Sequence, residues 1–327
     1  MTPESIAAEF DVPGQVVTVL SIETGNVNDT YRVIKRTTYS EVQFVLQRIS
    51  KAVFPRPDLV MANMKEITDY GHKRLEEQVV KSNRIWQLPK VLPTRDGKDF
   101  FVDAEGRYWR ALSMIASATS HEKVINVEHA HEAGYVLGHF QRIIADYPID
   151  QLADTLPGFH IAPGYLKHHD KVVKTDGAQK KLAASSEARR VEAFIQERRD
   201  FVPVLEDALA RGELKLRPIH GDPKITNIMM DDITGKGTAI IDLDTVKPGL
   251  IHYDFGDCVR SVCNPAGEDA KELKDVFVDV DFFEALVQGY LKQAQNFISD
   301  WDRKYLYDSV RLLTFELVLR FFTLEFN

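Results

Sequence analysis

The residues with the clearest capacity for chemistry lie in one run, HGDPKITNIMMDDITGKGTAIIDLDT, from His220 to Thr245. Four residues separate Asp222 from Asn227, and a predicted β-hairpin leads from Asn227 to Asp242. A carboxylate can accept the proton of an attacking hydroxyl, while carboxylate and amide oxygens can hold Mg²⁺ against nucleotide phosphates. The spacing therefore predicts phosphoryl transfer from ATP, with Asp222 as the catalytic base and Asn227 and Asp242 as magnesium ligands.

A second aspartate, Asp254, matches a kinase motif in its sequence letters and is therefore the alternative to Asp242 as the magnesium ligand. Protein kinases follow an H-R-D-x-x-x-x-N loop with Asp-Phe-Gly, and this triplet occurs here at Asp254. The tight hairpin after Asn227 favours Asp242, because Asp254 follows only after a further turn. We expect Asp254 and Asp257 to cap a helix or to brace the catalytic loop. An isolated His-Gly-Asp would be an ordinary turn, but that does not account for the whole pattern.

The residues that would bind the nucleotide form a less specific pattern than the run from His220 to Thr245. A polar loop over residues 25–30 lies between the first two predicted strands, where backbone N–H groups and short side chains could face phosphates, and an ordinary polar turn is the alternative. The third predicted strand offers Gln47 and Arg48 where kinases place a lysine. These neighbours point to opposite faces, so only one can face the nucleotide, with Glu66 as a candidate partner for a cation. The predicted nucleotide contacts are Asn26, Asn28, Thr30, Gln47, Arg48 and Met114.

Polar residues in mostly apolar surroundings supply the predicted contacts to the acceptor. Arg320 lies in the segment LVLRFF, where a charge needs a partner or a cleft. The alternative is an internal salt bridge, for example to Asp257. His160, in LPGFH, could instead be an ordinary loop histidine. The predicted substrate contacts are Arg110, His160, Asp244, Arg260 and Arg320.

The elements that must position these residues change character along the chain. Alternating apolar and β-branched residues predict strands first, and periodic apolar residues predict helices after Ile115. A polar stretch, Lys167–Ser186, is expected to be a mobile surface segment. The predicted strands are Val16–Glu23, Asn28–Lys35, Glu41–Ile49, Val91–Thr94, Asp99–Asp103, Arg107–Ile115 and the hairpin Ile228–Met230 and Thr238–Ile241. The predicted helices are Asp58 to about Ser82, Val127–Ala145, Ser185–Ala210, Asp281–Phe297 and Lys304–Phe322.

These patterns predict an α+β, two-lobed protein-kinase-like fold. Residues 1–115 would form a nucleotide-binding lobe, with an antiparallel β-sheet and one long helix. Residues 116–327 would form a larger, mostly helical lobe for catalysis and substrate binding.

Composition narrows the expected partners. The 327 residues are 44% hydrophobic and 28% charged, with a net charge of −8. A nucleic-acid partner would normally need a basic face, and the sequence shows no apolar run of membrane-spanning length. The first residues do not form a secretory signal, and two cysteines are too few for a disulfide framework. We expect a cytoplasmic enzyme with a small-molecule substrate, without nucleic-acid or membrane partners, and its oligomeric state is open.

Several of these motifs resemble the aminoglycoside phosphotransferase and choline kinase superfamily, over nearly the whole chain. They are GNVNDTY, FVLQRIS, YWRALSMI, LPGFH, HGDPKITN, IDLDTVKPGLIHYDFGDCVRS and LRFF. Within it, FVLQRIS, the Trp109-Arg110 pair and DTVKPGLIHYDFGD are most similar to the N-acetylhexosamine kinase type. This resemblance implies phosphorylation of the anomeric hydroxyl of an amino sugar, with Asp222 as the base. Two departures are the missing third-strand lysine and a chain that ends at Thr323–Asn327, where relatives are expected to continue.

Other functions stay open beside an N-acetylhexosamine kinase. Choline, another amino alcohol or an aminoglycoside could be the acceptor, although the predicted arginines favour a neutral or anionic one. Asp222, Asp242 and Asp244 could ligate the metal of a hydrolase, but the hairpin and the strand-rich first third favour a kinase. A non-catalytic nucleotide-binding regulator would fit the missing lysine, but not the complete set of Asp222, Asn227 and Asp242.

Overall fold

The computed structural model describes residues 1–22, 27–77, 84–268, 270 and 272–326. Contacts divide the chain into two compact units. The first unit comprises residues 1–120, 143–156 and 227–248, and the second comprises residues 121–142, 157–226 and 249–327. A single boundary after residue 115 does not describe these units, because two later segments fold with the N-terminal part. The assignment of a nucleotide-binding and a substrate-binding lobe stays a prediction.

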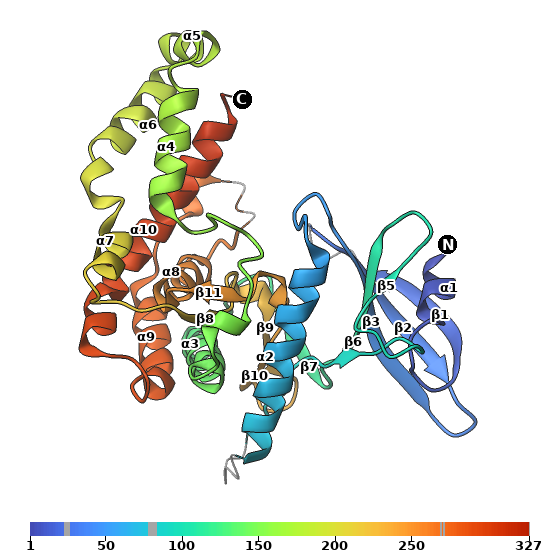
Figure 1. Ribbon diagram of the computed structural model, residues 1–327. Coiled ribbons are helices and arrows are strands. Elements are labelled where there is room, and N and C mark those ends of the chain that lie inside the picture. Colours follow the sequence, from blue (N-terminus) through green and yellow to red (C-terminus); the bar gives the residue numbers. More distant parts are fainter. Residues whose placement is uncertain (23–26, 78–83, 269, 271, 327) are drawn as a thin grey trace. The chain divides into compact units, whose positions relative to one another are not determined.

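An antiparallel sheet forms much of the first unit, in the strand order β1-β2-β3-β6-β4, with β5 paired to β6 (Figure 1). The first three strands match the prediction within one residue at every end that the described residues cover, because their apolar residues alternate with polar ones. The predicted end of the first strand, Glu23, lies outside the described residues. The later strands are shorter than predicted. The strands are β1 (Gln15–Ile22), β2 (Asp29–Arg36), β3 (Glu41–Ile49), β4 (Val91–Leu92), β5 (Phe101–Val102) and β6 (Tyr108–Ser113).

A short helix that was not predicted, α1 (Pro3–Ala7), packs on one face of this sheet. The Thr2 side chain caps it by accepting a hydrogen bond from the Ser5 N–H, and proline suits the first helical position. The buried side chains of the shared core are Ile6, Ala7, Phe10, Val12, Val33, Phe44, Leu46, Trp109 and Ala111.

Helix α2 (Pro57–Glu77) connects the later segments to the first unit. It begins one residue before the predicted start, and its predicted end falls in residues 78–83, outside the described residues. Asn63 on α2 is buried and donates hydrogen bonds to the carbonyl oxygens of Ala153 and Val246, each at 2.8 Å. The N–H of Ala153 donates in turn to Asn63 Oδ1, at 2.9 Å. A buried amide with its partners satisfied in this way holds both segments against α2.

A second, three-stranded sheet in the first unit has the order β10-β9-β7. Strands β9 (Ile228–Asp231) and β10 (Gly237–Ile240) form the predicted hairpin, with Ile228 opposite Ile240. The short strand β7 (Ala118–Ser120) was not predicted, because three residues carry too little alternation to be distinguished from a loop.

Helices dominate the second unit, and Figure 1 shows α4, α6 and α10 side by side. Strand β8 (Arg217–Ile219) leads into the HGD loop, and β11 (Lys247–Gly249) follows the second predicted metal ligand. The helices are most of α3 (Val127–Ile144), then α4 (Ala162–Val172), α5 (Asp176–Ala184), α6 (Ser186–Gln196), α7 (Val204–Ala210), α8 (Ile251–Val262), α9 (Val280–Ala294) and α10 (Asp300–Leu324).

Two predictions for the helical part of the chain were wrong. Most of the stretch 167–186, which was expected to be a mobile surface segment, forms the second half of α4 and all of α5, because Val172 and Ala178 pack against Phe326 in a small core. The predicted helix Ser185–Ala210 is divided into α6 and α7, since Pro203 cannot continue a helical hydrogen-bond ladder. Helix α9 is capped by Asp279, whose side chain accepts a hydrogen bond from the Phe282 N–H.

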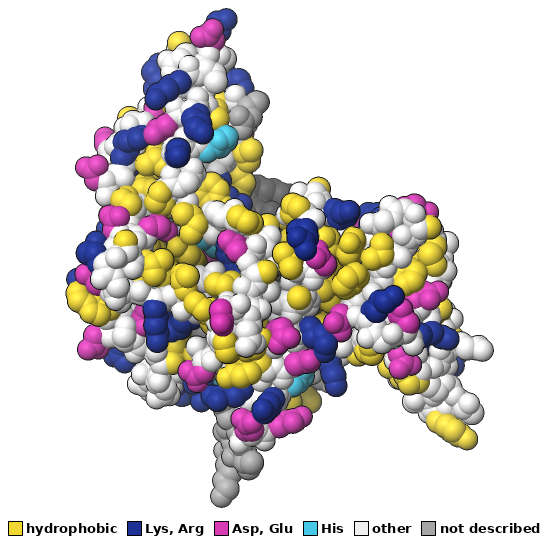
Figure 2. All heavy atoms as spheres, viewed as in Figure 1, with side chains coloured by type: hydrophobic (Ala, Val, Ile, Leu, Met, Phe, Trp, Pro, Cys, Tyr) yellow, Lys and Arg dark blue, Asp and Glu magenta, His cyan; other side chains and the backbone are white. Residues whose placement is uncertain are grey.

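The α+β fold class, with an N-terminal antiparallel sheet and a mostly helical remainder, is confirmed. Within the described residues, no helix has both the length and the apolar character needed to cross a membrane. Basic and acidic side chains are interspersed on the face seen in Figure 2.

Candidate active site

The loop that follows β8 is held by the buried side chain of Asp254 on α8. Asp254 accepts hydrogen bonds from the backbone N–H groups of His220 (2.9 Å) and Gly221 (2.8 Å). Gln141 Nε2 donates a third, at 2.9 Å. Burial nevertheless raises the pKa of Asp254, because it disfavours the charged form. The expectation that Asp254 braces the loop of the predicted base Asp222 is confirmed.

Asp222 follows directly on this braced turn. Its N–H lies 3.2 Å from His220 Nδ1, and Lys224 Nζ lies 3.4 Å from its Oδ2. Desolvation, and next the negative charge of Asp257, raise the pKa of the Asp222 carboxyl. A carboxylate with a raised pKa is a stronger base than an exposed one, which suits the predicted role of Asp222.

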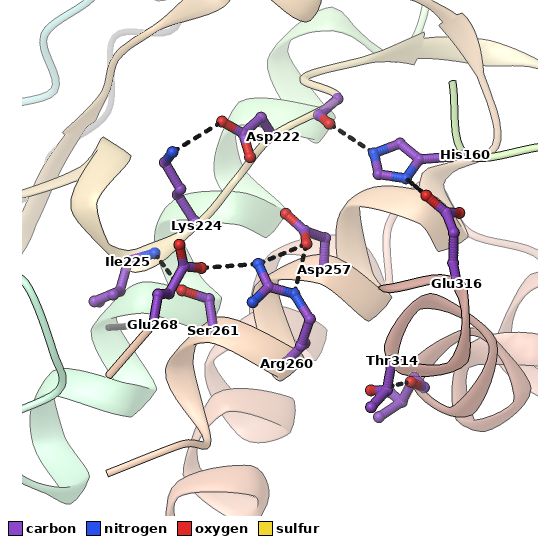
Figure 3. A network of polar contacts seen from close by, with 12 residues as sticks. His160, Asp222, Lys224, Ile225, Asp257, Arg260, Ser261, Glu268, Thr314 and Glu316 are labelled. Atoms are coloured by element: carbon purple, nitrogen blue, oxygen red, sulfur yellow. Dashed lines mark hydrogen bonds and ion pairs between the residues drawn. The ribbon is translucent and has the colours of Figure 1, made fainter. Parts of the chain in front are cut away.

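Helix α8 presents a second carboxylate to the same loop, that of Asp257 (Figure 3). Arg260 holds Asp257 Oδ1 through Nε at 2.9 Å and Nη2 at 2.8 Å, and its Nη2 also donates to Glu268 Oε1 at 2.8 Å. Gly256 lets α8 approach α10 closely, since a Cβ there would lie 2.6 Å from the Ser309 carbonyl oxygen. The predicted substrate contact Arg260 is thus engaged with two carboxylates.

His160 is buried and contacts the loop of the predicted base Asp222, so it is not an ordinary loop histidine. Its Nε2 lies 2.8 Å from the carbonyl oxygen of Gly221, which can only accept, so Nε2 donates. Its Nδ1 lies 3.2 Å from Glu316 Oε1 on α10. Desolvation alone would lower the pKa of His160, but the hydrogen bond and charge of Glu316 outweigh it, and the pKa is raised. His160 also has a left-handed φ of +66°, which is uncommon outside glycine.

Arg320 lies one helical turn after Glu316, with Nη1 at 3.5 Å from Glu316 Oε1. Its guanidinium lies over the rings of Phe159 (5.5 Å) and Tyr165 (5.6 Å). The internal salt bridge considered from the sequence therefore exists, with Glu316 in place of Asp257. The side chain is 35% exposed, so it retains surface for a ligand.

The two predicted magnesium ligands lie together at the base of the β9–β10 hairpin. The Ile241 N–H donates to the Asn227 carbonyl oxygen at 2.8 Å, which continues the ladder beyond β9 and β10. Asp242 comes directly after, in a left-handed conformation with φ of +64°. A carboxylate and an amide oxygen at one hairpin end are the ligand types that Mg²⁺ prefers, so these residues fit the predicted ion.

A buried polar network lies on the face of the sheet that carries Gln47. Gln47 lies opposite Arg110 on β6 and accepts a hydrogen bond from Arg110 Nε at 2.9 Å. Arg110 Nη1 forms an ion pair with Asp244, and both side chains are buried. Asn28 Nδ2 donates to the other oxygen of Asp244 at 2.6 Å, while Gln47 Nε2 donates to Thr30 Oγ1 at 3.1 Å. This network joins three predicted nucleotide contacts, Asn28, Thr30 and Gln47, to the segment that follows Asp242.

The remaining predicted nucleotide contacts, Arg48, Met114 and Asn26, have no described contact with this network. Arg48 points to the opposite face of β3 and pairs with Asp29. Met114 is partly exposed just after β6, and Asn26 lies outside the described residues. Glu66 accepts a hydrogen bond from the Tyr147 hydroxyl at 2.7 Å, rather than pairing with a third-strand cation.

Sequence reasoning missed Glu316 as a member of the site. The signal was present in LTFELVLRFF, where a glutamate precedes Arg320 by four residues in an apolar helix. Two opposite charges at this spacing lie on the same helix face, so Glu316 was a better candidate partner for Arg320 than Asp257.

Comparison with known proteins defines the class. A family model described as "Phosphotransferase enzyme family" matches residues 18–307. The chain belongs to this family, which confirms the predicted phosphotransferase with a hydroxyl acceptor, of the small-molecule kinase type.

Solved structures that are similar to this chain share its fold. A microcompartment-associated aminopropanol kinase matches with a TM-score of 0.63 and 16% identity, over 98% of this chain and 88% of that chain. A choline kinase from Cryptosporidium parvum Iowa II matches at 0.56 and 13% identity, over 95% and 84%. The AMP-bound complex of a spectinomycin phosphotransferase matches at 0.52 and 11% identity, over 99% and 92%. The predicted kinase-like fold is confirmed.

Proposed function

We propose that the protein transfers the terminal phosphoryl group of ATP to a hydroxyl of a neutral sugar, with the anomeric hydroxyl of an N-acetylhexosamine as the first choice. The observation that carries the proposal is the braced loop of Asp222, whose carboxylate has a raised pKa beside Lys224. Asp222 accepts the hydroxyl proton, the acceptor oxygen bonds to the terminal phosphorus, and ADP leaves as its bond to that phosphorus breaks.

The donor end of the reaction is assigned to the first unit. Asn227 and Asp242 would hold Mg²⁺, which supplies positive charge against the nucleotide phosphates. Arg110 takes the place of the missing third-strand lysine as the buried cation. Because its side chain is buried, it acts by positioning the segment of Asp244 and not by contacting the nucleotide itself. The AMP-bound relative supports an adenine nucleotide as the donor.

The contacts of aromatic side chains in the second unit support a neutral acceptor. A quaternary amine would need open aromatic faces. Three aromatic residues of the second unit, Tyr165, Tyr253 and Trp301, each have a basic side chain of this chain beside them. Arg320 lies over Tyr165 at 5.6 Å, the His160 ring stacks on Tyr253 at 5.8 Å, and Lys304 lies over Trp301 at 4.4 Å.

A kinase of a primary amino alcohol is the second candidate. One observation favours it: Glu206 Oε2 in the second unit is buried without a hydrogen-bond partner among the described residues. Its Oε1 accepts from the Tyr253 hydroxyl at 2.8 Å, and burial raises its pKa. A buried carboxylate of this kind could receive an ammonium group.

The test is an ADP-release screen with ATP and Mg²⁺ across hexosamines, neutral hexoses, aminoglycosides, choline, ethanolamine and aminopropanol. Phosphorylation of N-acetylglucosamine or N-acetylgalactosamine, with the product identified at the anomeric position, is the expected result. Efficient phosphorylation of an amino alcohol with every hexosamine ignored would replace the first candidate by the second.

A further inference from the structure

Asp257 is a buried carboxylate, and only one of its oxygens has a hydrogen-bond partner among the described residues. Its side chain is on α8 and the residue is 6% exposed. Both hydrogen-bonding contacts from Arg260 go to Oδ1. Oδ2 is buried and has no hydrogen-bond partner among the described residues. A buried carboxylate oxygen without a hydrogen-bond partner destabilises the folded protein, so such an atom is expected where a ligand completes the site.

The unpartnered oxygen faces the catalytic base. In Figure 3 the carboxylates of Asp257 and Asp222 point toward one another, while Arg260 holds the far oxygen of Asp257. Asp257 also lies close enough for its negative charge to help raise the pKa of the Asp222 carboxyl. A molecule whose hydroxyl is hydrogen-bonded to Asp222 would therefore bring its neighbouring atoms toward Asp257 Oδ2.

We propose that Asp257 Oδ2 accepts a hydrogen bond from a neutral O–H or N–H group on the carbon next to the phosphorylated hydroxyl, and that it selects acceptors by this group. This inference rests on the proposed function and adds a specificity residue to it. For an N-acetylhexosamine phosphorylated at the anomeric position, the donor is the N–H of the 2-acetamido group. Asp257 would thus recognise the substituent that distinguishes an amino sugar from a deoxy sugar.

The charges around Asp257 favour a neutral donor over an ammonium group or a metal ion. The Asp257 carboxylate is balanced by the Arg260 guanidinium at 2.8 Å, and Arg260 is held in place from its other side by Glu268. A second cation at Oδ2 would lie close to this guanidinium, and like charges repel in a buried site. A neutral N–H or O–H meets the acceptor without that penalty.

The first experiment needs no variant and compares acceptors on the wild-type protein. We expect kcat/KM for N-acetylglucosamine to exceed that for 2-deoxyglucose by about 10- to 100-fold, since one hydrogen bond to a charged group contributes about 1.5–3 kcal/mol. Glucosamine should not be preferred over N-acetylglucosamine. Equal use of the 2-deoxy sugar, or a clear preference for the ammonium form of glucosamine, would overturn the inference.

The second experiment uses Asp257→Asn, which places an amide of the same size beside Arg260. Because its oxygen is expected to stay with Arg260, its NH₂ would face the substrate donor. We expect kcat/KM for N-acetylglucosamine to fall about 10- to 100-fold and that for 2-deoxyglucose to change little. The matched control is Glu268→Gln, which removes one negative charge beside the same guanidinium and should leave the ratio between the two sugars unchanged.

The outcomes separate the inference from the proposed function. An equal loss on both sugars in Asp257→Asn would reduce Asp257 to a structural group, and a changed KM for Mg²⁺ would make it a metal ligand. Either result overturns the inference while sugar phosphorylation stands. If the wild-type protein phosphorylates neither sugar but does phosphorylate an amino alcohol, the proposed function fails first and the inference falls with it.

Discussion

Asp254 accepts a hydrogen bond from the backbone N–H of Gly221 at 2.8 Å, so the Asp-Phe-Gly triplet of this protein holds the loop that contains the predicted base Asp222. The N–H of His220 occupies its other oxygen. With Gln141 as a third donor, this carboxylate is buried among protein groups. The position that follows the β9–β10 hairpin is instead held by Asp242, which is the better candidate for the metal.

Replacing the proposed base should stop the chemical step and spare nucleotide binding. In Asp222→Asn we expect kcat to fall on the order of a thousand-fold, because the loss of a general base costs about 10²- to 10⁴-fold. ADP release measures kcat, and calorimetry measures the Kd for ATP with Mg²⁺. Asp207→Asn, at an exposed position of the same unit, serves as the control. Near-normal turnover in the Asp222 variant would remove this residue from the mechanism.

The two aspartates that compete for the metal should respond differently to the same change. Asp242→Asn should abolish magnesium-dependent nucleotide binding in calorimetry. Asp254→Asn should lower the free energy of unfolding by about 1–3 kcal/mol, because one oxygen acceptor of a buried group is lost. The reverse pattern, with metal dependence lost at Asp254, would show that the triplet holds the metal.

Removing one partner of the Arg110–Asp244 ion pair should lower the free energy of unfolding more than replacing both partners by apolar residues. Arg110→Met leaves a buried, unpaired carboxylate, which is expected to cost about 3–5 kcal/mol of folding free energy, whereas Arg110→Met with Asp244→Leu should recover much of it. Denaturant unfolding measures both.

If the network also positions Asp242, the recovered double variant should still bind Mg²⁺-ATP weakly in calorimetry. Wild-type nucleotide affinity in this stable double variant would reduce the Arg110–Asp244 pair to a purely structural role.

Removing the exposed part of the Arg320 side chain should weaken acceptor binding selectively. In Arg320→Ala we expect KM for the sugar to rise about tenfold or more, with KM for ATP little changed, since a lost charged hydrogen bond contributes about 1.5–3 kcal/mol. Arg311→Ala, on the same helix, provides the comparison. Equal effects on both KM values would indicate a general defect of folding.

The His160–Glu316 pair should make stability depend on pH in a defined direction. The pKa of His160 is raised above 6.5 in the folded state. The contribution of His160 to the free energy of unfolding is therefore fully present below pH 6.5 and is lost as pH rises through the raised pKa. Asp257, on the neighbouring helix α8, adds a further negative charge that favours the protonated imidazole.

We expect the stability difference between the wild-type protein and His160→Gln to be largest in mildly acidic buffer and to shrink above neutral pH. Thermal unfolding from pH 5.5 to 9 measures it, with the exposed His168→Gln as the control. A difference that grows with rising pH would contradict a raised pKa of His160 in the folded state.

The local parts of the site were available from the sequence. The interval from Asp222 to Asn227 and the hairpin leading to Asp242 span a short stretch of chain, so turn and strand patterns could predict their order. The first three strands were predicted for the same reason, because alternation along one strand reports which face is buried. Motif resemblance also indicated the family, which the family match over residues 18–307 confirmed.

Only the tertiary structure could pair residues that are distant in the chain. His160 and Glu316 are 156 positions apart, and Asn28 and Asp244 are 216 apart. The helices α4 and α5 were missed because few of their own residues are apolar, while Val172 and Ala178 pack against Phe326 near the other end of the chain. Secondary structure follows from the periodic spacing of apolar side chains that are close in the sequence. The partner of a buried charge is decided by how whole helices and strands pack, and local sequence patterns carry no information about that packing.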